Sequence, residues 1–95
     1  FNEPGSSFKS RTRVVELSER TIQDNARFFD SVEEVPKKAI TMGLGTIMEA
    51  KKVVLLAKGL QKKSILNQAI HGLVTEEIPA SILQKHPHME VYYCD

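Results

Sequence analysis

The chain has 95 residues, a length that suits one small domain, and its 13 Lys and Arg residues nearly balance its 12 Asp and Glu residues, for a formal net charge of +1. A charge this close to zero provides no basic field for nucleic acid or an anionic membrane surface, so we expect neither as a partner. One cysteine and the absence of an apolar run of roughly 20 residues predict a soluble, cytoplasmic protein without disulfides or membrane spans.

The first half of the chain predicts a loop, a strand and a helix. Residues 1–10 (FNEPGSSFKS) have the composition of an active-site loop, and because they start abruptly we expect them to belong to a longer chain. Arg11–Leu17 (RTRVVEL) is β-branched and roughly alternating, as in a strand. Ser18 suits the N-cap of a helix over residues 19–28. Its apolar face would consist of Ile22, Ala26 and Phe29.

The second half predicts strands alternating with short helices. Residues 39–42 (AITM) indicate a short buried strand, followed by a Gly43-Leu44-Gly45 turn and a helix over residues 46–51. Residues 53–57 (VVLLA) are apolar on both faces, which is typical of a central parallel strand covered by helices on both sides. The remaining elements are helices over residues 60–70 and 79–85 and a strand over residues 89–94.

This order predicts an α/β fold with a mainly parallel sheet. Four short strands with uncovered edges would invite pairing with further strands. We therefore expect residues 1–95 to be one part of a larger Rossmann-like, three-layer domain.

Two cations lie where α/β folds often bind phosphate. Arg27 is near the end of the first predicted helix, and Lys62 is in the first turn of a helix that follows Gly59. A lysine at a helix N-terminus opposes the helix dipole by a few tenths of a kcal/mol, and a bound anion would reverse that effect. Taken alone, this pattern favours a solvated lysine over a phosphate ligand, and the Gly43-Leu44-Gly45 turn is a weak nucleotide signal that favours a tight turn with positive φ.

The remaining candidates for chemistry are one glutamate, three histidines and the cysteine. Glu3 lies in a loop beside Pro4 and Gly5, a setting that suits a general acid or base or a group that orients a histidine, although a surface glutamate is the simpler interpretation. The histidines (His71, His86 and His88) lack metal-ligand spacing, so we expect no metal site. We expect Cys94 to be buried as a small apolar residue.

Four stretches, taken in order, resemble a known family. They are FNEPGSSFKSRTRVVEL at the start, NARFF at 25–29, VPKKAITMGLGTIMEAKKVVLLAKG at 35–59 and PASILQKHP at 79–87. Together they resemble the glucosamine-6-phosphate deaminase family, also called glucosamine-6-phosphate isomerase. The resemblance implies that residues 1–95 are the C-terminal portion of a single domain whose N-terminal half, with an Asp-Gly-His catalytic segment, is missing.

The resemblance implies conversion of glucosamine 6-phosphate and water into fructose 6-phosphate and ammonium, without a cofactor, in amino-sugar catabolism. A histidine assists ring opening, an aspartate moves a proton between C2 and C1, and a glutamate beside the histidine orients it. Glu3 falls on that glutamate, and the other two groups would lie upstream of residue 1. Arg27 and Lys62 fall on the cations that hold the substrate phosphate, so a small-molecule sugar phosphate is the expected partner and residues 1–95 alone are expected to be inactive.

One departure concerns regulation. Allosteric members bind N-acetylglucosamine 6-phosphate with serines like Ser6 and Ser7, an arginine like Arg13 and a lysine two positions further on, where this chain has Val15. The loss of a charge-assisted contact predicts a non-allosteric enzyme. The alternatives are a galactosamine-6-phosphate deaminase, a sugar-phosphate-binding regulator without catalysis and, ranked last, a 6-phosphogluconolactonase. The sequence leaves the oligomeric state open, a homo-oligomer included.

Overall fold

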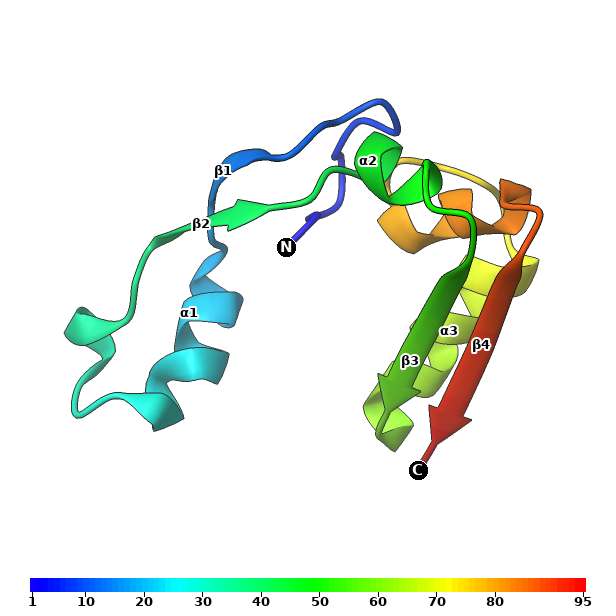
Figure 1. Ribbon diagram of the computed structural model, residues 1–95. Helices are drawn as coiled ribbons and strands as arrows, with labels where there is room; N and C mark the ends of the chain where they lie inside the picture. Colours follow the sequence, from blue (N-terminus) through cyan, green and yellow to red (C-terminus); the bar gives the residue numbers. More distant parts are fainter.

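The computed structural model describes residues 1–95 and shows an α/β fold with two small sheets (Figure 1). Strand β1 (Arg13–Glu16) pairs antiparallel with β2 (Lys38–Thr41), and β3 (Val53–Lys58) pairs parallel with β4 (Met89–Cys94). The parallel pairing expected for the last two strands is confirmed. A single, mainly parallel sheet is wrong for the first two strands, which form a sheet of their own.

The direction of β2 follows from the segment that connects it to β1. This segment leaves the end of β1 and returns at the same end, where the Leu17 N–H donates to the Lys37 carbonyl at 2.8 Å. A parallel pair would need a crossover to the opposite end of the sheet. Residue patterns within each strand contain no information on that return path, and for this reason the sequence predicted the wrong direction.

The connecting segment contains the first helix, α1 (Glu19–Asn25), and two 3₁₀ turns, η1 (Ala26–Phe28) and η2 (Val32–Glu34). Ser18 caps α1 as expected, because its Oγ accepts a hydrogen bond from the Thr21 N–H at 3.2 Å. The predicted helix end at Phe28 is correct in position, but its last turn is 3₁₀. Together with β1 and β2 these elements form one arm of the molecule (Figure 1).

The second arm contains the parallel sheet and its helices. Besides β3 and β4, this arm contains α2 (Leu44–Met48), the 3₁₀ turn η3 (Leu60–Lys62), α3 (Lys63–His71) and the longer 3₁₀ segment η4 (Pro79–Lys85). Helix α3 lies against one face of the β3–β4 pair, with η4 beside it (Figure 1). No helix in the structure has the length and apolar character to cross a membrane.

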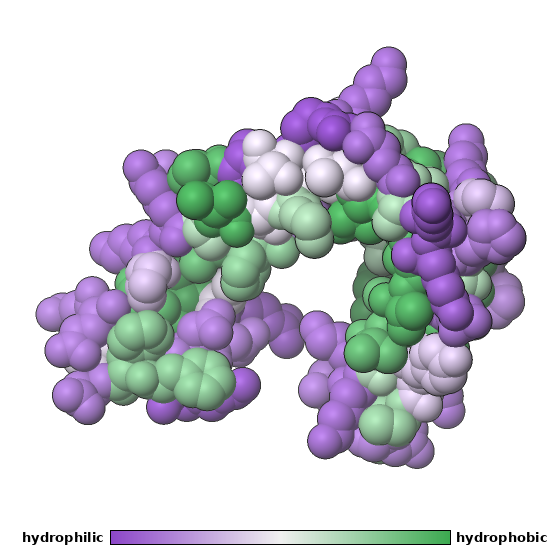
Figure 2. All heavy atoms as spheres, viewed as in Figure 1, coloured by the Kyte–Doolittle hydropathy of each residue, from purple (hydrophilic) through white to green (hydrophobic).

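The core is small, and both sheets leave one face open. Only seven of the 95 residues are buried, and the hydrophobic ones among them are Val35, Leu44, Ala69 and Leu83. β3 is covered on one face only. Its outer residues Val54 and Leu56 are 48% and 73% exposed, and Tyr92 of β4 is 57% exposed. Figure 2 shows such apolar side chains on the surfaces of both arms.

Three burial expectations are therefore wrong. β3 lacks its second covering layer, Ile40 in the strand expected to be buried is 76% exposed, and Cys94 is exposed at the end of β4. The physical reason is the same in each case, since apolar character indicates which residues should be covered but not whether the covering segment is within residues 1–95.

His86 is one of the few buried polar residues, and both ring nitrogens have partners. Its Nε2 lies 2.7 Å from the Ala50 carbonyl oxygen, and its Nδ1 accepts from the His88 N–H at 3.0 Å. Because Nδ1 accepts, Nε2 must carry the proton and donate it, which defines the neutral tautomer. The ring thus connects the end of η4 to the segment after α2.

We expect His86→Ala to lower the free energy of unfolding by about 1–3 kcal/mol, because two hydrogen bonds are lost in a buried position. Urea denaturation followed by circular dichroism measures this change. His71→Ala is the control, since His71 is exposed and its loss should change stability by less than about 0.5 kcal/mol. Equal stabilities of the two variants would contradict the structural role of His86.

Candidate functional site

The loop of residues 1–10 lies where the two arms meet, and other segments satisfy its polar groups. The Asn2 side-chain amide donates to the Met42 carbonyl at 2.9 Å. Glu76 accepts twice, through its carbonyl from the Gly5 N–H and through its carboxylate from the Phe8 N–H, both at 2.8 Å. A loop with this many partners has a defined conformation rather than that of a free surface segment.

Glu3 is held inside this loop. Its carbonyl accepts from the Ser6 N–H at 3.0 Å and from the Ser6 hydroxyl at 2.6 Å. Its half-buried carboxylate accepts from the Thr21 hydroxyl through Oε1 at 3.2 Å, while Oε2 has no partner. The structure thus presents one carboxylate oxygen that is already bound and one that is available.

The residues predicted as effector-site remnants take part in the same loop. Ser6 closes the turn at Glu3, and the Ser7 hydroxyl accepts from the Lys9 N–H at 3.1 Å. Arg13 donates through Nη1 to the Asn2 side-chain oxygen at 2.7 Å. All three make contacts within or next to the loop, and their predicted role toward an effector stays a prediction.

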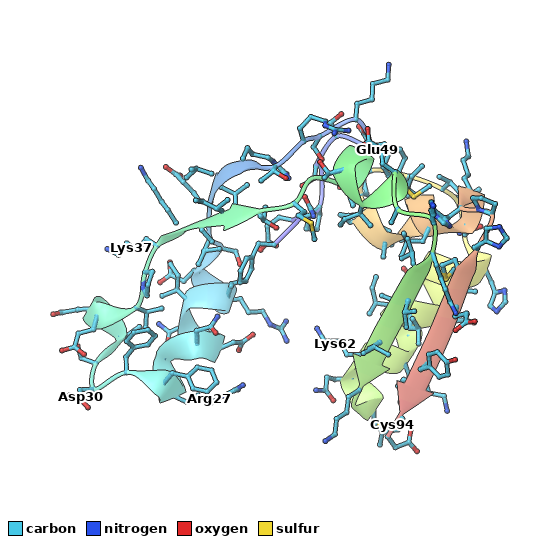
Figure 3. All side chains as sticks on the ribbon, viewed as in Figure 1. Arg27, Asp30, Lys37, Glu49, Lys62 and Cys94 are labelled. Carbon is cyan, nitrogen blue, oxygen red and sulfur yellow. The ribbon has the colours of Figure 1, made fainter.

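The two predicted phosphate ligands lie on different arms (Figure 3). Arg27 lies within η1, is exposed, and its guanidinium stacks over the Phe28 ring at 4.6 Å from the centroid. Lys62 is exposed at the start of α3. Neither side chain forms an ion pair within the chain. The structure does not bring the two cations into contact, so whether they share one phosphate stays a prediction.

A cavity of about 400 Å³ lies beside Lys62. The loop residues Asn2 and Pro4 also line it, so Lys62 and the neighbourhood of Glu3 border the same space. Its apolar wall comes from the inner face of β3, from α3 and from residues 78–80, and Glu77 is its carboxylate. The cavity therefore combines an apolar wall with one cation and one anion.

The turn before Lys62 depends on Gly59. This residue has φ +101°, which permits the sharp change from β3 to η3 and is strained for other residue types. The Gly59 carbonyl accepts from the Lys62 N–H at 3.0 Å and from the Tyr93 hydroxyl at 3.2 Å, and partial burial raises the pKa of that phenol. The N–H groups of Gly59 and Lys62 are used within the chain, the first by the Cys94 carbonyl and the second by the Gly59 carbonyl.

The Gly43-Leu44-Gly45 turn binds the loop rather than a ligand. The Leu44 N–H donates to the Ser10 hydroxyl and the Gly45 N–H to the Ser10 carbonyl, both at 2.9 Å. Gly43 has φ −75°, so the expected positive φ is wrong for it. Its role is steric, because a Cβ at this position would lie 2.1 Å from the Ser10 carbonyl oxygen.

We expect Gly43→Ala to displace the loop from α2, since neither backbone can yield without losing the Ser10 hydrogen bonds. Destabilisation by about 1–3 kcal/mol is expected, as for overpacking of a close contact. Urea denaturation measures it, and Gly5→Ala is an informative comparison because that site has a positive φ but open space around it. Unchanged stability of Gly43→Ala would show that the close approach is unimportant.

One exposed ion pair lies next to the end of the loop. Arg11 donates to both carboxylate oxygens of Glu49, at 2.7 and 3.0 Å, and these hydrogen bonds hold the pKa of Glu49 below its usual value. Both side chains are more than half exposed, so the pair adds little stability. Its contribution is to connect residue 11 to the end of α2.

Sequence reasoning missed two residues that contact this loop, Thr21 and Glu76. Thr21 lies 18 positions from Glu3, and Glu76 lies 68 positions from Phe8. Threonine at a helix start and glutamate in a polar segment carry no signal of such partners, because both contacts depend on how distant segments fold together.

Residues 9–93 match the family model described as glucosamine-6-phosphate isomerases/6-phosphogluconolactonase. The chain belongs to this family. Within it, the glucosamine-6-phosphate deaminases of Lachnoclostridium phytofermentans and Streptococcus pyogenes serotype M18 are 54% and 55% identical to the chain, over 99% and 96% of its length. A solved structure of a monomeric glucosamine-6-phosphate deaminase is 48% identical over 98% of the chain, with a TM-score of 0.91.

The chain spans about two fifths of the length of these relatives, namely 40% and 39% of the two deaminases and 39% of the solved structure. The expected membership and the α/β fold are confirmed. None of these matches supports the expected C-terminal position within the longer chains.

Proposed function

We propose that the chain is part of a glucosamine-6-phosphate deaminase, which converts glucosamine 6-phosphate and water into fructose 6-phosphate and ammonium in amino-sugar metabolism. The observation that carries this proposal is an identity of 48–55% to proteins of that name and to the solved structure, along nearly the whole chain. Because the chain covers only part of them, residues 1–95 alone would be inactive and turnover would need the longer protein.

Glu3 would act on a catalytic histidine located outside residues 1–95. Its carboxylate is half-buried, and Oε2 is available to accept from an imidazole N–H. A carboxylate in that position favours the imidazolium and selects the tautomer that the histidine needs during ring opening. The defined conformation of the loop supports this role, because an orienting group must itself be held.

Arg27 and Lys62 would bind the phosphate of the substrate. Both cations are exposed and without an ion pair, so both are available to an anion. A planar guanidinium and an ammonium suit a phosphate with about two negative charges near neutral pH. Holding the phosphate end of an opened sugar would bring C1 and C2 close to the catalytic carboxylate. This proximity would contribute to the reaction rate.

The uncovered sheet faces fit a larger Rossmann-like, three-layer domain. Val54, Leu56 and Tyr92 are exposed apolar side chains on the outer face of β3 and β4, with Glu90 beside Val54. In the longer protein, further segments would cover this face and provide the missing layer, since an apolar face of a parallel sheet is normally buried.

We expect the longer protein to release ammonia from glucosamine 6-phosphate, and Glu3→Gln to lower kcat by about 10²–10⁴-fold because the orienting charge is lost. A coupled ammonia assay measures both. Glu33→Gln is the matched control, since Glu33 is exposed on η2 far along the chain. Release from galactosamine 6-phosphate alone would favour the galacto enzyme, and no release from either epimer would favour a sugar-phosphate-binding regulator.

We expect rate curves for glucosamine 6-phosphate to be hyperbolic with or without N-acetylglucosamine 6-phosphate. Val15 stands in β1 opposite Ala39 and has no ammonium to offer an effector phosphate, and Arg13 already donates to the Asn2 side chain. Steady-state kinetics with and without the effector tests this. A sigmoidal curve that the effector makes hyperbolic would contradict it.

A further inference from the structure

The carboxylate of Glu3 has one side-chain partner in the structure, the hydroxyl of Thr21. The distance from Thr21 Oγ1 to Glu3 Oε1 is 3.2 Å, and both residues are half-buried. Thr21 lies in the first turn of α1, three positions after the Ser18 cap, whereas Glu3 lies in the loop at the junction of the arms. The contact therefore connects the loop to the arm that carries Arg27.

The direction of the hydrogen bonds around Thr21 follows from proton counting. Ser18 Oγ lies 2.9 Å from Thr21 Oγ1 and also accepts from the Thr21 N–H. A hydroxyl has one proton, and an ionised carboxylate can only accept. The Thr21 proton therefore goes to Glu3, and the Ser18 proton goes to Thr21. Each hydroxyl then donates once, and the helix cap and the carboxylate form one ordered chain.

We propose that Thr21 is a positioning residue for Glu3, which binds Oε1 so that Oε2 remains turned toward the group that Glu3 serves. This inference rests on the proposed function of Glu3. A carboxylate with both oxygens free can rotate about its last bond, while a hydrogen bond to one oxygen selects one orientation. Thr21 is suited to this because its backbone is fixed by the helix and by the Ser18 cap.

The hydroxyl of Thr21 can be removed without losing the backbone hydrogen bond that caps α1. Ser18 accepts from the backbone N–H of Thr21, which any residue other than proline retains. Thr21→Val keeps the side-chain shape and this N–H but removes the donor to Glu3. Thr21→Ser keeps the donor. The pair of variants thus distinguishes the hydrogen bond from the packing and capping roles of the same position.

The test compares Thr21→Val and Thr21→Ser in the longer protein by ammonia release from glucosamine 6-phosphate, with thermal unfolding measured in parallel. We expect Thr21→Val to lower kcat about 10-fold or more with KM unchanged, since a hydrogen bond to a charged group is lost away from the phosphate. Thr21→Ser should restore kcat to within about 2-fold of the original. Thr12→Val, at an exposed threonine, should change neither parameter.

Two sets of results separate this inference from the proposed function. Ammonia release by Thr21→Val at the original kcat, a Thr21→Ser variant as slow as Thr21→Val, or an effect on KM alone would overturn the positioning role while Glu3→Gln remains impaired. If the original protein releases no ammonia, or Glu3→Gln keeps full turnover, the proposed function of Glu3 fails and the role of Thr21 fails with it.

Discussion

The polar backbone of the loop of residues 1–10 must find hydrogen-bond partners, and the rest of the site depends on how it does so. Ser10 binds the start of α2, Asn2 binds the end of β2, and Gly5 and Phe8 bind Glu76. These partners come from both arms and are dispersed along the chain. Another conformation would break these hydrogen bonds together, so the loop has little freedom to adopt one.

Glycine makes this arrangement sterically feasible. Gly43 and Gly45 let the Ser10 backbone come within contact of α2, at a place where a side chain would collide with it. With the loop held there, the Glu3 carboxylate reaches Thr21 on the other arm. The position of a single carboxylate thus depends on a glycine turn, a helix cap and a glutamate that are far apart in sequence.

The two arms differ in what they contribute to the proposed chemistry. One arm supplies Arg27 and the Thr21 contact, and the other supplies Lys62 and the cavity beside it. A sugar phosphate that bound both cations would connect the arms through its phosphate. The uncovered apolar faces of the sheets show that residues 1–95 bury little of their own apolar surface, which fits a segment of a longer domain.

The sequence by itself determined the elements whose causes are local. The Ser18 cap, the strand over residues 89–94, the Gly59 turn and the helix that follows it all depend on residues within a few positions of each other, and family membership was evident from short stretches in order. Only the tertiary structure decided the antiparallel direction of β2, the exposure of Cys94 and the contacts of Thr21 and Glu76. These features depend on how distant segments of the chain pack together, and the residue type at a single position does not predict that packing.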